Sequence, residues 1–181
     1  AGVARQEGSQ DGAGASARFA WPAGMVSDGA GHLFVTDNHN NTIRQVNTTT
    51  NQVTTLAGSA TQEGSRDGSG PAARFASPAG MAWDQAGPLY VVDARNHTIR
   101  RITTTGEVTT LAGAPDQTGS NDGTGTAARF HDPTDIVYDG TGALYITDMT
   151  NRTIRKLVIA TRQVVTFAGS PDSDNRDSDG I

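Results

Sequence analysis

Short apolar runs, separated by Gly, Asn and Asp, follow one another along the chain. In the first third of the sequence they cover residues 25–26, 33–37, 42–46 and 52–56. The runs are rich in β-branched and aromatic residues, and their hydrophobic period is 2 rather than 3.6. The pattern therefore predicts four short β-strands joined by tight turns.

The same order of strands recurs twice. Equivalent runs lie at residues 81–83, 89–93, 98–102 and 107–111, and a third set continues to Phe167. Aligning the copies divides the chain into residues 1–56, 57–111, 112–167 and a remainder, 168–181, that is an acidic tail or the start of a further repeat. Four antiparallel strands repeated every 55 or 56 residues are typical of propeller blades. We predict an all-β fold, a β-propeller with three four-stranded blades.

Residues at fixed spacing also indicate a family. The string P-A-G-M…D-x-x-G-x-L-[FY]-V-x-D-x-x-N-x-T-I-R, followed by V-x-T-[LF]-A-G, resembles the NHL repeats of β-propellers. The resemblance covers nearly the whole chain. It implies a propeller, commonly of six blades, that binds proteins, peptides, RNA or glycans on one face. A minority of the wider propeller relatives are metal-assisted lyases or lactonases, so the resemblance indicates architecture better than activity.

Charge and composition limit the kinds of partner that this chain can be expected to bind. The net charge of −5 argues against an overall basic field that attracts nucleic acid or anionic lipid. No apolar run approaches the roughly 20 residues of a membrane-spanning helix. The absence of cysteine removes disulfides and thiolate chemistry but leaves the cellular compartment open. We expect a second copy, a protein, a peptide or a glycan as partner, and neither nucleic acid nor membrane.

One glycine-rich loop occurs three times, as DGAGASARF, DGSGPAARF and DGTGTAARF at residues 11–19, 67–75 and 122–130. It lacks the alternating oxygen ligands of a calcium loop and the third glycine of a dinucleotide fingerprint. Because it recurs between the last strand of one repeat and the first strand of the next, we interpret it as structural. We call these segments the clasp loops.

Each clasp loop is expected to combine a turn glycine, an ion pair and an apolar plug between blades. The predicted residues are Asp11, Arg18 and Phe19; Asp67, Arg74 and Phe75; and Asp122, Arg129 and Phe130. Arg44, Arg100 and Arg155 alternate with apolar residues on the third strand, which predicts a solvated or salt-bridged face. Replacing Arg74 should therefore destabilise the fold more than replacing Arg44.

Other polar positions also recur. Asp37, Asp93 and Asp148 end the second strand of each repeat and are expected to cap the following hairpin together with Asn40, Asn96 and Asn151. The glycosylation sequon occurs at Asn40, Asn47, Asn96 and Asn151. These sequons matter only if a eukaryotic secretory pathway makes the protein.

Function that one blade alone carries must come from positions where the copies differ. The candidate ligand-binding residues are Trp21, Arg95, His131, Asp132, Asp135 and Met149. Asp135 replaces a glycine just before the innermost strand of the third repeat. The HDPTD stretch that contains it is interpreted either as a contact for a cation or basic ligand, or as drift in an exposed loop.

Catalytic signals are weak. The four histidines occupy four different places in the repeat, although two could meet across blades, and no Ser-His-Asp or paired-carboxylate spacing is present. In the tail, Asn175, Asp177 and Asp179 fit the opening of a calcium loop without its closing Glu, or simply a solvated acidic segment. We expect no cofactor, with calcium in the tail as the alternative.

Three blades alone leave two apolar blade faces bare. We therefore expect a non-catalytic binding or assembly module that forms a homodimer and closes a six-bladed ring. A head-to-tail filament, blades in a longer parent chain and a metal-dependent lyase or lactonase remain alternatives.

Overall fold

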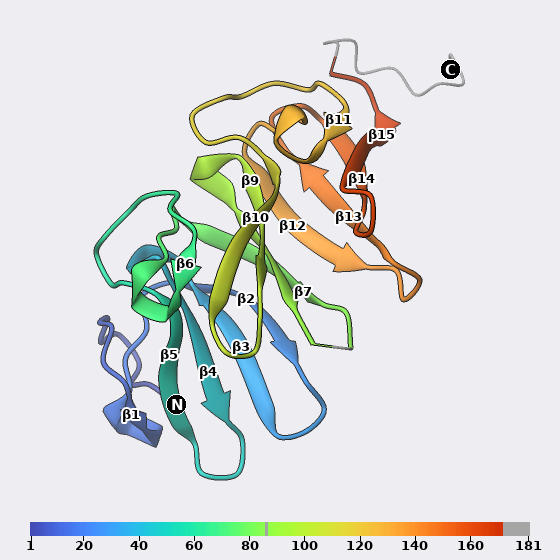
Figure 1. Ribbon diagram of the computed structural model, residues 1–181. Coiled ribbons are helices and arrows are strands. Elements are labelled where there is room, and N and C mark those ends of the chain that lie inside the picture. The colour runs from blue at the N-terminus through green and yellow to red at the C-terminus, as the bar shows by residue number, and fades with distance from the viewer. Residues whose placement is uncertain (86, 172–181) are drawn as a thin grey trace, which may run out of the picture.

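Three antiparallel sheets follow one another along the chain and fan out side by side (Figure 1). The structure, a computed structural model, describes residues 1–85 and 87–171. We call the three sheets blades 1, 2 and 3. The predicted fold, an all-β propeller with three antiparallel blades, is confirmed.

Each blade has five strands. Blade 1 contains β1 (Gly12–Ala13), β2 (Pro22–Ser27), β3 (His32–Asp37), β4 (Thr42–Asn47) and β5 (Gln52–Gly58). Blade 2 contains β6 (Gly68–Ser69), β7 (Pro78–Trp83), β8 (Leu89–Asp93), β9 (Thr98–Ile102) and β10 (Glu107–Gly113). Blade 3 contains β11 (Gly123–Thr124), β12 (Pro133–Tyr138), β13 (Ala143–Asp148), β14 (Thr153–Val158) and β15 (Gln163–Gly169).

The fifth strand of each blade comes from the clasp loop. The strand order in blade 1 is β1-β5-β4-β3-β2, so the two-residue β1 pairs with the outer edge of its own blade, with Gly12 opposite Val53. Each clasp loop continues into a single 3-10 turn: η1 (Gly14–Ser16), η3 (Gly70–Ala72) and η5 (Gly125–Ala127). The first residue of each turn has the expected positive φ, between 50° and 56°. Sequence reasoning predicted four strands per blade and missed this short edge strand.

Apolar cores lie between the blades, and we call each interface between successive blades a seam. Phe75 is fully buried in the first seam, against Phe34 and Ile43 of blade 1 and Leu89 of blade 2. Phe130 is equally buried in the second seam. Both phenylalanines therefore lie where a residue that fills the gap between blades must lie.

The innermost strands β2, β7 and β12 lie close together along the axis of the fan. A Cβ atom added at Gly24 would lie 2.5 Å from the carbonyl oxygen of Ala79, and one added at Gly80 would lie 2.6 Å from Cα of Asp135. Neither glycine has a positive φ. Glycine is therefore required at these two positions by the neighbouring strand and not by the backbone angles.

A buried arginine on the third main strand organises the polar interior of each blade. Arg44 is fully buried and lies 2.7 Å from both Asp11 of the clasp loop and Asp37 at the end of β3. In blades 2 and 3 the same network joins Arg100 to Asp67 and Asp93, and Arg155 to Asp122 and Asp148. The interpretation of these arginines as a solvated face is therefore wrong, although salt bridges do form.

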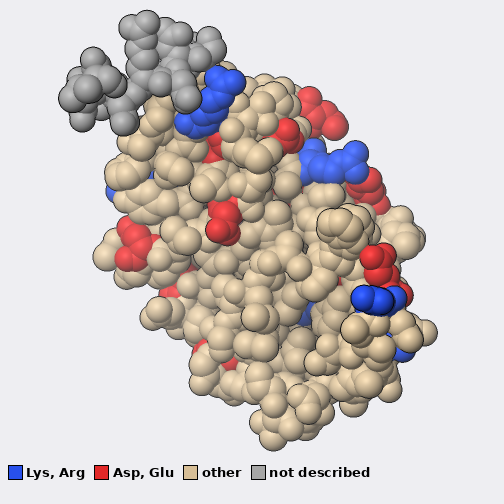
Figure 2. Space-filling view, turned by 180° about the vertical axis from the view of Figure 1, so that it is seen from behind, with Lys and Arg blue, Asp and Glu red and all other residues tan. Residues whose placement is uncertain are grey.

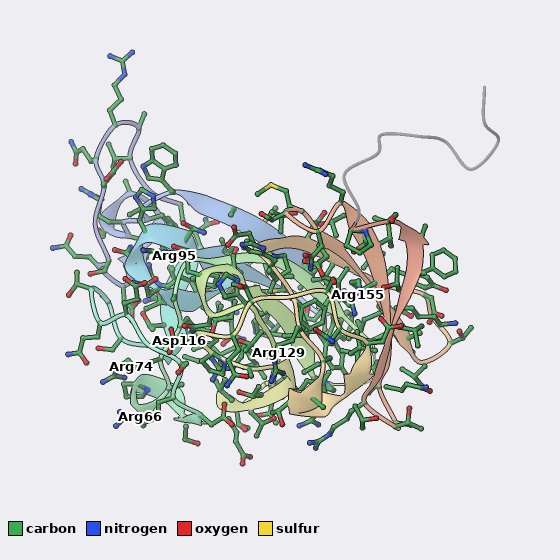
Figure 3. All side chains as sticks on the ribbon, turned by 90° about the horizontal axis from the view of Figure 1, so that it is seen from above. Arg66, Arg74, Arg95, Asp116, Arg129 and Arg155 are labelled. Carbon is green, nitrogen blue, oxygen red and sulfur yellow. The ribbon has the colours of Figure 1, made fainter. Side chains whose placement is uncertain are left out.

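The predicted pairing of the clasp-loop arginines with the clasp-loop aspartates is also wrong. Arg74 donates to the carbonyl oxygens of Pro71 and Ala73 and to the side chain of Gln62. Arg18 and Arg129 make the equivalent contacts. Arg74 lies at the periphery of the fold in Figure 3, whereas Arg155 is fully buried. The third-strand arginine takes the carboxylates because its side chain points into the blade.

The aspartates that end the second strand do not cap their own hairpins. Asp37 accepts a hydrogen bond from the backbone N–H of Ala20, which lies before β2, and others from Arg44 and Asn40. The side-chain amide of Asn40 also donates to the carbonyl of Gly8. This aspartate therefore ties the start of the inner strand to the second hairpin turn.

The same geometry bears on the sequons. Asn40, Asn96 and Asn151 are buried, and each side-chain amide donates two hydrogen bonds. A glycan attached to that nitrogen would replace one of its two hydrogens and break at least one of these bonds, at a side chain that is buried. Asn47 is half-buried and uses only its side-chain oxygen, as acceptor from the N–H groups of Thr49 and Thr50. The structure thus removes three of the four glycosylation candidates from the folded chain.

Candidate functional site

One set of loops carries most of the predicted ligand-binding residues. Trp21, Ser77 and Asp132 each precede the proline that begins an inner strand, with φ between 51° and 55°. Asn41, His97 and Arg152 end the turn before the third main strand, with φ between 55° and 57°. We call the surface formed by these loops the loop face. The six left-handed residues form two sets of three equivalent positions, and within each set the side chains differ chemically.

Side chains of the loop face connect the blades across each seam. The N–H of Ser77 donates to Oδ1 of Asn41 at 2.8 Å, and the N–H of Asp132 donates to Nδ1 of His97 at 3.2 Å. In both seams the side chain that ends a turn of one blade accepts from the backbone that begins the next blade. We call this contact the latch.

His97, His131 and Asp132 come together at the second latch. The two imidazole rings are 5.9 Å apart and nearly perpendicular, and Asp132 lies 3.6 Å from His97 and 3.9 Å from His131. The hydroxyl of Thr150 also donates to Asp132. Two of the four histidines therefore do meet across blades. Residues 1–85 and 87–171 nevertheless contain no group of three or more His, Asp or Glu side chains placed to hold a metal ion.

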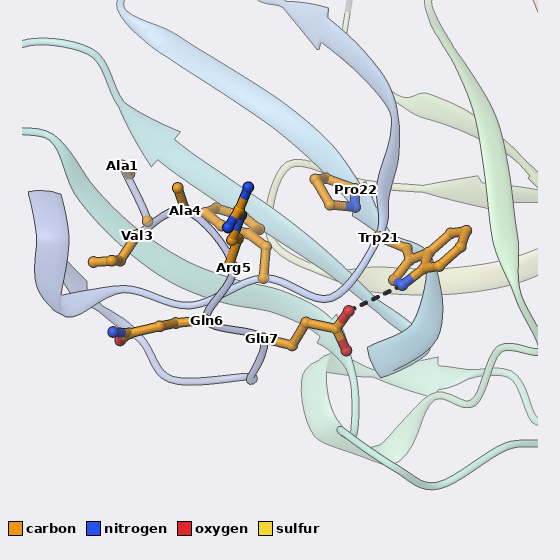
Figure 4. Close-up of a pocket in the computed structure, with 10 residues that line it drawn as sticks. Ala1, Val3, Ala4, Arg5, Gln6, Glu7, Trp21 and Pro22 are labelled. Atoms are coloured by element: carbon orange, nitrogen blue, oxygen red, sulfur yellow. Dashed lines mark hydrogen bonds between the residues drawn. The ribbon is translucent and has the colours of Figure 1, made fainter.

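Trp21 forms a second cluster on blade 1. Its ring stacks on His39 with the centroids 4.6 Å apart, and its indole N–H donates to Glu7 at 3.0 Å (Figure 4). Trp21 remains 64% exposed. A cavity of about 400 Å³ lies beside it, lined by residues 1–7 together with Phe19 and Pro22. In blades 2 and 3 the equivalent face, which carries Phe75 or Phe130, is buried in a seam. On blade 1 this face is open.

The remaining candidates lie apart from one another. Arg95 is on blade 2, exposed and paired with Glu63 at 3.2 Å, and Met149 is exposed on blade 3. Asp135 lies on the inner strand β12, where its carboxylate accepts from the N–H of Ile136 and its own N–H donates to the hydroxyl of Thr147. Only His131 and Asp132 among the six predicted residues form one cluster.

Blade 3 also presents an open apolar face. Tyr145 packs edge-on against Phe167 with centroids 4.9 Å apart, and the ammonium of Lys156 lies 5.6 Å from the Tyr145 ring. A small cavity of about 150 Å³ is lined by Asp135, Val137, Tyr145, Ile154 and their neighbours. The equivalent residues of blade 2, Ala82, Tyr90, Ile99 and Leu111, are buried in the second seam.

The aspartates of the clasp loops form hydrogen bonds and ion pairs within their own blades. Asp67 accepts from Arg100 and from both the N–H and the hydroxyl of Thr110. The guanidinium of Arg100 also lies over the ring of Phe75, 5.2 Å from its centroid. Full burial raises the pKa of Asp93 to about 6, and the Arg100 guanidinium opposes this rise. The carboxylates of this network thus accept hydrogen bonds from residues of their own blade.

Charged side chains are scattered on the face seen from behind and form no continuous basic patch there (Figure 2). No helix in the described part of the chain is both long and apolar enough to cross a bilayer. The calcium prediction for Asn175, Asp177 and Asp179 lies outside the described residues.

Sequence reasoning missed His39, Asn41 and His97, which complete the loop face. Their signal was positional, since Asn41, His97 and Arg152 fall at one place in the repeat. A hairpin turn that needs a left-handed residue usually selects Asn or Gly. A histidine or an arginine at this place therefore indicated a side chain with a role beyond the turn itself.

Comparison with known proteins agrees with the fold. The NHL repeat model matches residues 19–46. NHL repeat-containing protein 2 from Bos taurus is 33% identical over 163 residues, which are 83% of this chain and 22% of that protein. Protein SUPPRESSOR OF QUENCHING 1, chloroplastic, from Arabidopsis thaliana is 36% identical over 95 residues, 52% of this chain and 9% of that protein. The chain thus spans less than a quarter of each of these two relatives.

A solved structure shows the same architecture. An auxiliary nutrient binding protein from Bacteroides thetaiotaomicron superimposes with a TM-score of 0.66 at 24% identity, over 80% of this chain and 36% of that one. At this identity the likeness concerns the fold alone. Three equivalent blades, the match to the family model and the similarity to NHL repeat-containing proteins lead to one conclusion: the chain belongs to the NHL-repeat family of β-propellers.

Proposed function

We propose that this chain is a non-catalytic propeller module that works by assembly. The open face of blade 3 in one copy packs on the open face of blade 1 in another, and two such contacts close a six-bladed ring. The carrying observation is that both open faces have the composition of faces that are buried inside the chain. Exposed apolar surface of this kind favours association.

The face of blade 1 supports the proposal most directly. Met25 is 61% exposed, whereas its equivalent Met81 is 6% exposed in the first seam. On blade 3, Phe167 is 59% exposed, whereas its equivalent Leu111 is 3% exposed in the second seam. A second copy would bury these side chains as the seams do, by packing an opposite pair of faces. Two copies related by a two-fold axis make both contacts at once.

In such a ring the loop face would be the ligand-binding surface. Trp21, Arg95, His131 and Asp132 supply aromatic, cationic and acidic groups, and Met149 adds an adaptable apolar side chain. A protein, peptide or glycan suits this mixture of groups. The repeated carboxylates are held by buried arginines, which supports a binding role in preference to a metal-dependent lyase or lactonase.

The oligomeric mass tests the proposal. Light scattering at micromolar concentration should give twice the 18.8 kDa of the chain. Phe167→Asp should return the mass to that of one chain, because a carboxylate would be buried in the contact. Thr104→Asp, on an exposed turn of blade 2, is the matched control and should remain dimeric. A monomeric wild type would overturn the proposal, and an open-ended mass distribution would replace the ring with a filament.

A further inference from the structure

The two seams inside the chain share a latch that a seam between blade 3 and blade 1 of another copy cannot form. Asn41 and His97 accept the latch hydrogen bond through a side-chain oxygen or nitrogen. The equivalent residue of blade 3 is Arg152, which has the same left-handed backbone and is exposed. A guanidinium only donates hydrogen bonds. A blade joined to blade 3 must therefore be held there by a different contact.

The residue that Arg152 would meet is Trp21. Ser77 and Asp132 are the partners in the two existing latches, and Trp21 is their equivalent at the open side of blade 1. One face of its indole stacks on His39, and the ring is otherwise largely exposed. A guanidinium over an exposed indole is a favourable cation–π pair. Arg152 and Trp21, the two latch positions that have no latch partner within the described part of the chain, are thus chemically complementary.

The inner strands impose a second difference. Where Gly24 and Gly80 let the next inner strand approach, blade 3 carries Asp135. At the spacing of the existing seams, the Cβ atom of Asp135 would overlap the backbone of the following strand, as the Cβ atoms built on Gly24 and Gly80 do. A clash with backbone is relieved only by moving the strand. A third seam must therefore be wider near the axis than the first two.

We infer that the seam between two copies is held at the loop face by Arg152 over Trp21 and is spread at the axis by Asp135. The inference rests on the proposed assembly and identifies the residues that decide its strength. Asp135 weakens the contact and Arg152 with Trp21 directs it. Such a seam opens more easily than the seams within a chain.

Sedimentation measurements of the dimer dissociation constant test this seam. Arg152→Ala and Trp21→Ala should each raise the Kd about fivefold, and the double variant should raise it little further because one contact is lost in all three. Arg95→Ala is the matched control, an exposed arginine of blade 2 that pairs with Glu63 and should leave the Kd unchanged. Asp135→Gly should lower the Kd about tenfold, since the strands could then approach.

The outcomes separate the two proposals. A dimer whose Kd rises independently for Arg152→Ala and Trp21→Ala, or does not fall for Asp135→Gly, would overturn the seam and leave the assembly standing. A monomeric wild type that becomes dimeric as Asp135→Gly would overturn the assembly of the native chain and support the seam. Monomers in both cases would overturn both.

Discussion

Each buried arginine acts as the central tie of its blade. Arg100 joins the clasp loop through Asp67, the end of β8 through Asp93 and the backbone carbonyl of Arg74, and it lies over Phe75. A guanidinium suits this place because its flat fork can bind several oxygens in different directions. Removing it would leave the buried carboxyl group of Asp93 without its cationic partner.

Arg100→Ala should therefore lower the free energy of unfolding by about 3 kcal/mol or more, the usual range for breaking a buried ion pair. Arg74→Ala in the same blade removes only peripheral hydrogen bonds and should cost about 1 kcal/mol. Urea unfolding of the two variants measures the difference. Equal losses would contradict the central role of Arg100.

Asp139 illustrates a residue that acts through its charge in a turn. Its carboxylate accepts from the N–H groups of Thr141 and Ala143, and these bonds lower its pKa to about 2 from an ordinary value of 3.8. Because the folded pKa is lower than the unfolded one, the stabilisation is fully present above pH 4. It is lost as the pH falls through 2.

Asp139→Asn keeps an oxygen acceptor and removes the charge. The variant should melt below the wild type at pH 5 and above, and the two melting temperatures should converge as the pH approaches 2. Thermal unfolding followed between pH 2 and pH 6 measures this, with Asp116→Asn on another exposed turn as control. A difference that persists unchanged at pH 2 would show that the charge is not responsible.

At the scale of elements, the fan depends on how closely inner strands approach. Gly80→Ala should destabilise the chain by about 1–3 kcal/mol, because the added methyl group meets the backbone of β12. Gly87→Ala has open space around its new Cβ, so it should be nearly neutral. Comparison of the two by urea unfolding separates crowding from the general effect of replacing glycine.

At the scale of the whole molecule, the blades differ in how many of their faces are packed against another blade. Blade 2 has neighbours on both faces, while blades 1 and 3 each have one open face. Hydrogen exchange should therefore be slowest in β8 and β9. Raising the protein concentration should add protection in blades 1 and 3 if copies associate. Uniform exchange across the three blades, at any concentration, would contradict this picture.

The sequence was informative wherever one local rule applied in all three copies. The four main strands of each blade follow from alternating apolar residues, and the clasp-loop turn follows from its glycines. Sequence reasoning paired Arg18 with Asp11 and placed Arg44 on a solvated or salt-bridged face, whereas Arg44 is the arginine that binds Asp11. Both arginines recur in every repeat, so repetition could not distinguish them. Sequence spacing does not say which guanidinium points inward. That choice depends on which strand is covered by the clasp loop.

The sequence by itself determined the blade, its threefold repetition and the family, because strand periodicity and turn chemistry are local and recur. The tertiary structure alone decided the partners of Asp11 and Asp37, the meeting of His97 with His131, and the contact between Gly80 and Asp135. Apart from Asp37, which pairs with Arg44 only seven residues away, these residues are distant along the chain or in different blades. Their geometry follows from how sheets pack face to face, which no run of neighbouring residues encodes.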